Sequence, residues 1–160
     1  MHSLNFPAPG MTESALVVDL DSRSLYEMCK GLRDIGYRTV GATSFVEAKR
    51  FLIAEHPSIL IADVRLGEFN GIQLLLLAKE LRPGISVVIT TAFPDVVLAA
   101  ETQRMGGVFM VKPIDARELV ETVKVRSSAS KETDRRQSDR RVLHIPNFSP
   151  DRRVSNRRRV

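Results

Sequence analysis

The sequence predicts an open α/β fold in which one parallel β-sheet is covered by helices on both faces. Two patterns support this prediction. Short, β-branched apolar runs recur along the first 125 residues, and segments with apolar residues at helical spacing separate them. The chain has 160 residues, of which 43% are hydrophobic and 27% are charged, as is typical of an ordinary globular domain with a buried core.

The first two strand and helix pairs follow one another without a break. Ala15–Asp19 has the pattern of a strand, and apolar residues then recur at helical spacing from Leu25 to Ile35. Gly36 is expected to end this helix. Tyr37–Gly41 is the second predicted strand, and Ser44–Glu55 is the second predicted helix.

Three more strands are predicted from short, continuously apolar runs, which suit strands covered on both faces. These runs are Ile59–Asp63, Ser86–Thr90 and Val108–Val111. The helical stretches that follow them are Ile72–Leu81, Asp95–Met105 and Ala116–Val125. Because crossovers between parallel strands are right-handed, five such units favour a flavodoxin-like, doubly wound (βα)5 sheet with strand order 2-1-3-4-5.

Polar residues stand at the ends of four predicted strands. Asp19 and Asp21 follow the first strand, Asp63 ends the third, Thr91 follows the fourth and Lys112 follows the fifth. We expect these side chains at one edge, because the carboxyl ends of parallel strands lie together and form the ligand site of such sheets. Acids, a hydroxyl and a lysine suit a hard divalent cation and a phosphoryl group, so Mg²⁺ is the expected cofactor.

Four motifs in this order carry a resemblance to a known family. They are Val-Val-Asp19, Ile-Ala-Asp63-Val-Arg-Leu-Gly-Glu-Phe-Asn-Gly71, Thr91-Ala92 and Val-Lys112-Pro113. Together they resemble bacterial response-regulator receiver domains. The resemblance implies a signalling protein of a two-component phosphorelay, in which Asp63 accepts a phosphoryl group from a sensor histidine kinase or phosphotransfer protein. The domain would then alter a face near its fourth helix, fifth strand and fifth helix that contacts a downstream protein target.

The resemblance also implies roles for the other residues of this edge. Lys112 would hold phosphoryl oxygens by charge, and Thr91 would donate a hydrogen bond to one of them. The peptide bond before Pro113 is expected to be cis, which would direct Lys112 into the site. Phe109 stands where the family carries an aromatic residue that turns inward when Thr91 moves, so Thr91 and Phe109 are the predicted switch pair.

The predicted metal site departs from the family pattern at one position. The resemblance implies that Asp19, Asp63 and the backbone carbonyl of Arg65 bind Mg²⁺. The family has a second acid directly after the first, and Leu20 occupies that place here. Loss of a charged oxygen ligand should weaken Mg²⁺ binding unless Asp21 reaches the metal. Asp21 has a competing role as a helix cap, which we favour.

The residues leave two other functions to consider. If the change at Leu20 prevents phosphorylation, the chain would be a phosphorylation-independent, receiver-like adaptor that recruits partners through its surface and basic tail. Magnesium binding separates the two hypotheses. An enzymatic function is disfavoured, because no second reacting group accompanies Asp63.

The charge distribution divides the chain. Residues 1–125 hold 13 Lys and Arg against 15 Asp and Glu, whereas residues 126–160 hold 11 against 4. We expect a flexible N-terminal extension over residues 1–13, a receiver domain over 14–126 and a disordered arginine-rich tail over 127–160. The extension has no predicted structural role, which leaves Met1 and Met11 as alternative starts.

The tail contains a short repeat, since Asp134–Arg141 is nearly repeated as Asp151–Arg158. Arginine pairs bind phosphates and carboxylates, so the tail is predicted to bind a partner protein, an acidic surface or nucleic acid, with a solubility role as the alternative. No apolar run is long enough to span a membrane, and we expect a cytoplasmic protein. The single cysteine, Cys29, is expected to be a buried apolar residue.

Overall fold

The main sheet has the predicted parallel topology. The computed structural model describes residues 13–126, so residues 1–12 of the predicted extension and the predicted tail over 127–160 lie outside the described residues. The sheet has the order β2-β1-β3-β6-β7, and every neighbouring pair is parallel. Its strands are β1 Ser14–Val18, β2 Arg38–Ala42, β3 Ile59–Asp63, β6 Ser86–Thr91 and β7 Val108–Val111. The predicted order 2-1-3-4-5 is therefore confirmed, since β6 and β7 are the fourth and fifth strands of this sheet.

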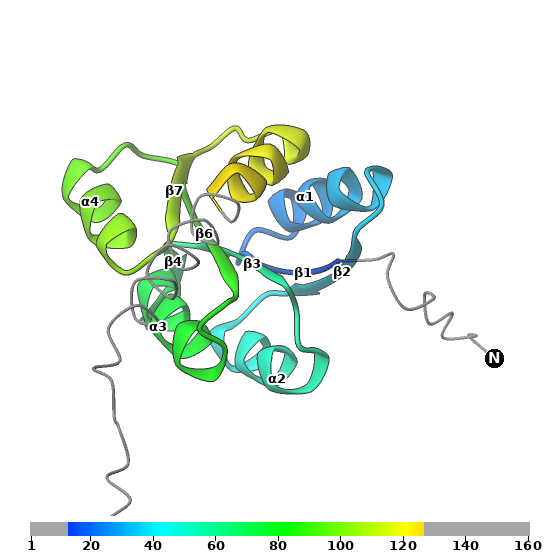
Figure 1. The fold of residues 1–160 in the computed structure, drawn as a ribbon, viewed down its shortest axis with the longest axis horizontal. Helices are drawn as coiled ribbons and strands as arrows, with labels where there is room; N and C mark the ends of the chain where they lie inside the picture. The colour runs from blue at the N-terminus through cyan, green and yellow to red at the C-terminus, as the bar shows by residue number, and fades with distance from the viewer. Residues whose placement is uncertain (1–12, 127–160) are drawn as a thin grey trace, which may run out of the picture. The chain divides into compact units, whose positions relative to one another are not determined.

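Helices cover both faces of the sheet (Figure 1). The helices are α1 Ser22–Asp34, α2 Phe45–Glu55, α3 Gly71–Leu81, α4 Val96–Arg104 and a final helix over residues 116–126. In Figure 1, α1 and the final helix lie on one side of the strands, and α2 and α3 lie on the other. The sequence placed α2, α3, α4 and the final helix to within one residue at either end, whereas α1 begins three residues before Leu25, the first apolar position of its predicted pattern.

Two apolar clusters form the core, one on each face of the sheet. One joins alternate residues of the central strands to α2 and α3, with Leu60, Leu74 and Leu75 fully buried. The other joins the intervening residues to α1 and the final helix, with Leu32 and Leu119 fully buried. Because successive strand residues point to opposite faces, strands buried on both faces are expected to be largely apolar, as β1, β3 and β6 are.

Polar residues fix where the helices begin. The side chains of Asp21, Ser44, Asn70 and Asp95 each accept a hydrogen bond from a backbone amide in the first turn of the helix that follows. At the other end of α1, Gly36 adopts a φ of 95°, which only glycine adopts readily, and the chain turns there into β2. The predicted role of Gly36 is confirmed.

A small hairpin after β3 was not predicted. β4 Arg65–Leu66 and β5 Phe69–Asn70 pair in antiparallel fashion. The ring of Phe69 stacks on Phe45, the first residue of α2, with 4.4 Å between centroids and 17° between planes. The hairpin is thereby attached to α2, and it separates the end of β3 from the start of α3.

Two further predictions concern the described residues. Cys29 is 4% exposed and belongs to the apolar cluster that packs against α1 and the final helix, so its predicted burial is confirmed. Burial raises the pKa of its thiol. Among the described residues, no helix is both long and apolar enough to cross a lipid bilayer.

Candidate functional site

The carboxyl edge of the sheet brings together three of the predicted site residues. The Lys112 ammonium lies 2.6 Å from Asp19 Oδ2 and 2.6 Å from Asp63 Oδ2. Asp19 follows β1, Asp63 ends β3 and Lys112 follows β7. Since β1 and β3 are neighbours in the sheet, the two carboxylates lie side by side, and Lys112 donates to both. We call Asp19, Asp63 and Lys112 the acidic cluster, because its formal charge is negative.

Backbone amides hold the two carboxylates in place. Arg65 donates its N–H to Asp63 Oδ1 at 2.8 Å, and Asp21 donates its N–H to Asp19 Oδ1 at 2.9 Å. Each carboxylate therefore has one oxygen bound to a backbone amide and the other to Lys112. Such charge-assisted bonds restrict the rotation of both side chains.

The electrostatics of Lys112 follow from its two acidic neighbours. Partial burial on its own lowers the pKa of this ammonium, because the charged form loses hydration. Its hydrogen bonds to Asp19 and Asp63, together with their negative charges, more than offset that effect, so the pKa of Lys112 lies above its ordinary value. Lys112 is thus a firmly charged group at neutral pH.

Thr91 lies at the end of β6, beside the lysine. Its carbonyl oxygen accepts a hydrogen bond from the backbone amide of Lys112 at 2.8 Å, so the ends of β6 and β7 are joined here. The Thr91 hydroxyl oxygen accepts one from the backbone amide of Phe93 at 3.2 Å. The Lys112–Pro113 peptide bond is cis, as the resemblance implied.

Phe109 lies in β7, two residues before the strand ends. It is partly buried and packs against the core cluster on the α2 and α3 face of the sheet. Its register partner in β6 is Ile89, two residues before Thr91. The predicted switch residues are therefore on adjacent strands, and their movement stays a prediction.

Asp21 is used as a helix cap. Its carboxylate accepts hydrogen bonds from the backbone amides of Arg23 and Ser24, at 2.9 and 3.1 Å. These two bonds lower the pKa of the Asp21 carboxyl, and the bond from Ser24 has the larger effect. The favoured interpretation of this residue thus agrees with its contacts.

The acidic cluster suits a hydrated Mg²⁺ ion bound by few protein ligands. Among residues 13–126, no three His, Cys, Asp or Glu side chains gather closely enough to hold a metal ion, and the Leu20 side chain is 49% exposed. Mg²⁺ keeps several of its waters and needs one or two carboxylates from a protein, which Asp19 and Asp63 can supply. The two carboxylates therefore fit Mg²⁺, although they supply one negative charge fewer than the pattern of receiver domains offers. The role of the Arg65 carbonyl stays a prediction.

Two supporting features escaped the sequence analysis. Gly71, at the start of α3, packs directly on the Asp63 backbone, where an added Cβ would lie 2.5 Å from the Asp63 carbonyl oxygen. The Arg65 guanidinium lies over the ring of Phe93, 5.4 Å from its centroid. Gly71 closes the quoted motif and so was visible in the sequence, but no local signal links Arg65 to Phe93.

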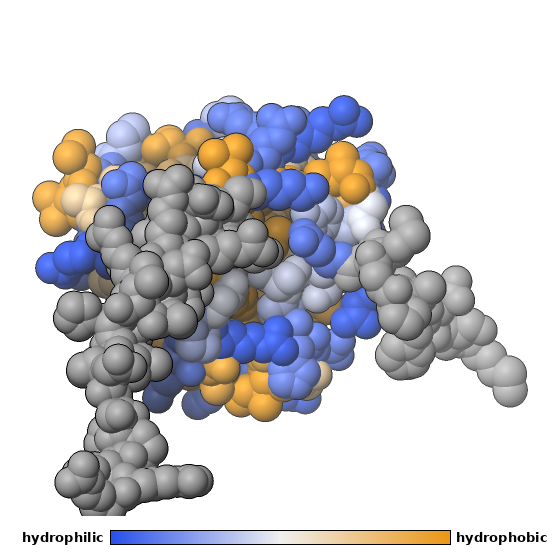
Figure 2. Space-filling model, in the orientation of Figure 1, coloured by the Kyte–Doolittle hydropathy of each residue, from blue (hydrophilic) through white to orange (hydrophobic). Residues whose placement is uncertain are grey.

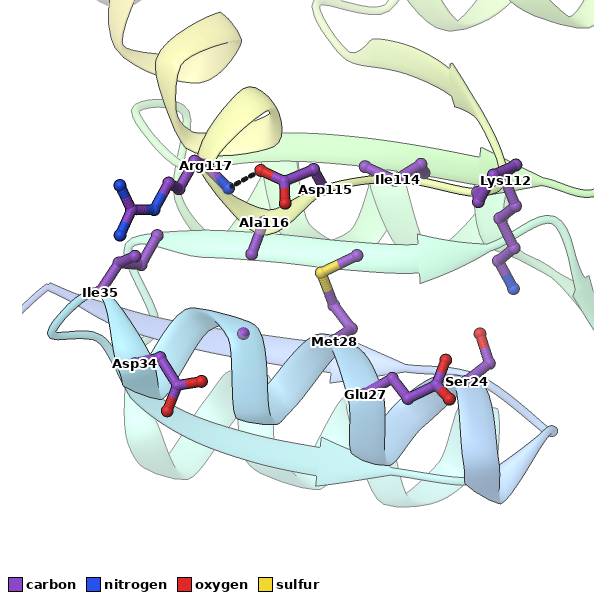
Figure 3. A pocket seen from close by; sticks show the side chains of 12 residues that line it. Ser24, Glu27, Met28, Asp34, Ile35, Lys112, Ile114, Asp115, Ala116 and Arg117 are labelled. Carbon is purple, nitrogen blue, oxygen red and sulfur yellow. Dashed lines mark hydrogen bonds between the residues drawn. The ribbon is translucent and has the colours of Figure 1, made fainter.

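A groove of about 590 Å³ opens beside Lys112, between α1 and the loop that leads from β7 to the final helix. Figure 3 shows Met28 projecting into it from α1, with Glu27 and Asp34 along the same helix. Ala116 faces α1 where Gly31 leaves room, since a Cβ on Gly31 would lie 2.9 Å from the Ala116 Cβ. The groove therefore runs from the acidic cluster along α1.

Comparison with known protein families identifies the class of domain. The sequence model of the response regulator receiver domain family matches residues 15–124. The photosynthetic apparatus regulatory protein RegA of Cereibacter sphaeroides is 29% identical over 111 residues, covering 69% of this chain and 60% of that protein. The transcriptional regulatory protein GlrR of Escherichia coli is 35% identical over 111 residues, covering 68% of this chain and 24% of that protein. The match thus spans only part of the length of these relatives.

Solved structures agree on the fold. A CheY-like response regulator receiver domain protein from Methanospirillum hungatei superposes with a TM-score of 0.68 at 24% identity, covering 76% of this chain and 98% of that one. A response regulator from Burkholderia pseudomallei, solved with a phosphorylated aspartic acid, a calcium ion and citrate, superposes with a TM-score of 0.68 at 20% identity, covering 76% of this chain and 72% of that one.

Proposed function

Since the chain belongs to the response regulator receiver family and so to two-component signalling, we propose that it accepts a phosphoryl group on Asp63 from a sensor histidine kinase or phosphotransfer protein. The observation that carries the proposal is the pair of 2.6 Å hydrogen bonds from Lys112 to Asp19 and Asp63. A nucleophilic carboxylate beside a fixed cation is what phosphoryl transfer to aspartate requires.

The proposed step is an in-line displacement. An Asp63 carboxylate oxygen attacks the phosphorus of a phosphohistidine, an O–P bond forms and the N–P bond breaks, and the electron pair stays on the imidazole. Asp63 needs no separate base, because a carboxylate is already unprotonated as a nucleophile. Its two hydrogen bonds, from Arg65 N–H and Lys112, set the direction from which it attacks.

The neighbouring groups would then stabilise the product. Lys112 neutralises charge on the phosphoryl oxygens, and the Thr91 hydroxyl donates a hydrogen bond to one of them. Asp19 and Asp63, with the Arg65 carbonyl, would hold Mg²⁺, which supplies further charge neutralisation when bound. A movement of Thr91 breaks its present bond with the Phe93 amide, which is the local change that starts the switch.

The signal would leave through the face formed by α4, β7 and the final helix. Figure 2 shows apolar side chains at the surface over α4. The exposed apolar residues of this face include Val96 and Val97, which open α4, and Val111, which ends β7. Exposed apolar side chains next to a movable strand suit recognition of a downstream protein. Binding of an acidic surface or nucleic acid by the arginine-rich residues 127–160 stays a prediction.

One observation favours a second function, that of a phosphorylation-independent adaptor. Leu20 offers no oxygen where the family has an acid, and Asp21 is engaged as a helix cap. If Mg²⁺ does not bind to a site that lacks this acid, the fold would act as a fixed interaction surface. The adaptor would recruit partners through its surface and the basic residues 127–160, and labelling of Asp63 separates the two functions.

The test is incubation with acetyl phosphate and MgCl2 followed by intact mass measurement. The parent chain is expected to gain the mass of one phosphoryl group, and Asp63→Asn is expected to gain none. Thr122→Ala serves as the control, because this threonine is a partly buried helix residue remote from the strand ends. No gain in the parent, under conditions that label another receiver domain, would reject the phosphorelay proposal in favour of the adaptor.

A further inference from the structure

The acidic cluster has a charge problem that its own lysine does not solve. Asp19 and Asp63 contribute two negative charges, and Lys112 contributes one positive charge that both carboxylates share. A phosphoryl donor is itself an anion, so it meets a net negative cluster at short range. Coulomb repulsion at such distances slows association unless cations offset it. Mg²⁺ would offset it when bound to the two carboxylates, and a protein cation near the entrance would attract the donor further.

Arg65 is a cation held next to this entrance. Its backbone N–H donates to Asp63 Oδ1, and its pairing with Asn70 in the β4–β5 hairpin fixes the backbone from which the side chain extends. Within residues 13–126, no carboxylate lies within ion-pair distance of the guanidinium, which instead lies over the Phe93 ring. Its hydrogen-bond donors are therefore not used by an acidic side chain.

Phe93 lies in the loop after β6, and its side chain lies beside Arg65. Its N–H donates to the Thr91 hydroxyl oxygen, and its ring is 62% exposed. The Arg65 and Phe93 side chains thus meet on the solvent side of the two loops whose backbones bind Asp63 and Thr91. A cation over an aromatic face is attracted by the ring, but an exposed contact of this kind is weak enough to exchange for a phosphate.

We infer that Arg65 is a second positioning cation of the proposed phosphorylation site, held ready over Phe93, and that it binds the oxygens of the incoming phosphoryl donor. The planar guanidinium can bind two phosphoryl oxygens at once, which the shared ammonium of Lys112 does not do. Arg65 acts on the donor and the transferring group, while Asp63 remains the nucleophile. This inference rests on the proposed function.

The experiment measures the initial rate of labelling by acetyl phosphate at several donor and salt concentrations. In this step an Asp63 oxygen forms a bond to phosphorus, the bond from phosphorus to the acetyl oxygen breaks, and acetate leaves with the electron pair. Arg65→Ala is expected to lower the second-order rate constant about tenfold, less than the loss of a buried donor, since the site is open to solvent. The loss should lie mainly in the apparent KM, and the salt dependence should become shallower.

Three variants separate charge from structure. Arg65→Lys keeps a positive charge and should recover part of the rate. Phe93→Tyr keeps an aromatic face and should retain most of the parent rate, whereas Phe93→Leu keeps apolar bulk without that face and should fall between Phe93→Tyr and Arg65→Ala. The matched control is Arg104→Ala, which removes a 78% exposed arginine at the far end of α4 and should leave the rate unchanged.

The outcomes are distinct. If the parent is labelled but Arg65→Ala matches Arg104→Ala, or if its loss is independent of salt and not rescued by lysine, Arg65 is not a positioning cation, and the proposed function stands. If the parent gains no phosphoryl group at any donor concentration, the proposed function fails, and this inference fails with it. A selective, salt-sensitive loss that lysine partly restores supports both.

Discussion

Two loops at the carboxyl edge of the sheet use their acidic residues in different ways. After β1, Asp19 binds Lys112, whereas Asp21 binds the first amides of α1, and Leu20 between them is exposed. At the end of β3, Asp63 binds Lys112, and the chain then folds into a hairpin that returns the Arg65 amide to this carboxylate. Asp21, two residues after Asp19, therefore caps a helix and does not bind Lys112. Sequence position relative to the strand end therefore decides which role a carboxylate has.

The largest expected effect comes from crowding the loop after β3. In Gly71→Ala the new Cβ meets the Asp63 carbonyl oxygen at 2.5 Å, and the backbone must shift. We expect a loss of about 2 kcal/mol in the free energy of unfolding, measured by urea denaturation, together with slower labelling of Asp63. Gly84→Ala is the control, because nothing lies within 4 Å of its Cβ, and its change should stay within about 0.5 kcal/mol. Equal stabilities for the two variants would show that Gly71 does not support Asp63.

Restoring an acid to the loop after β1 should strengthen Mg²⁺ binding. Leu20→Asp adds a charged oxygen ligand at an exposed position next to Asp19, and we expect the Kd for Mg²⁺ to fall about tenfold in calorimetric titrations. Leu20→Asn adds an uncharged oxygen and should give a smaller gain. An unchanged Kd in Leu20→Asp would mean that position 20 does not face the ion.

The contact between the hairpin and α2 should contribute a smaller energy. The stack of Phe69 on Phe45 joins the loop after β3 to α2. Among the described residues, no stack of aromatic rings joins the loop after β1 to this helix. A double-mutant cycle with leucine at each position should give a coupling energy of about 1 kcal/mol. Additive effects of the two substitutions would indicate that the stacked rings are merely adjacent.

The smallest expected effect concerns Asp21. Asp21→Ala removes the cap of α1 and should lower the midpoint of thermal unfolding by a few degrees, whereas Asp21→Asn keeps a capping oxygen and should change it less. Neither change should alter the Kd for Mg²⁺. Weaker Mg²⁺ binding in Asp21→Asn would make Asp21 a ligand and remove the contrast between the two loops.

Much of this edge could be predicted from the sequence because a single rule governs it. Parallel strands end at one edge, so the residues after β1, β3 and β7 had to lie together, and Asp19, Asp63 and Lys112 do. The same alternation of strands and helices predicted the sheet order. Apolar periodicity located the strands and helices, because each main element is long enough to show it, and the right-handed crossover rule then gave the order of the strands.

The remaining features depend on contacts that no local pattern encodes. β4 and β5 have two residues each, which is too short for periodicity, and the hairpin is fixed by the ring of Phe45 from a distant part of the chain. The contact of Arg65 with Phe93 joins two loops by side chains alone. Neither contact could be predicted without the folded arrangement of the sheet.

The central claim, that Asp63 is the phosphoryl acceptor, is tested most directly by marking the labelled residue. Borohydride reduces an aspartyl phosphate to homoserine, and trypsin then releases Phe51–Arg65, in which Asp63 is the only aspartate, separately from the peptide that carries Asp19 and Asp21. After treatment with acetyl phosphate and MgCl2, we predict homoserine at position 63 and unmodified aspartate at 19 and 21. Homoserine in the Asp19 peptide, or in neither peptide while intact mass shows a phosphoryl gain, would contradict the account.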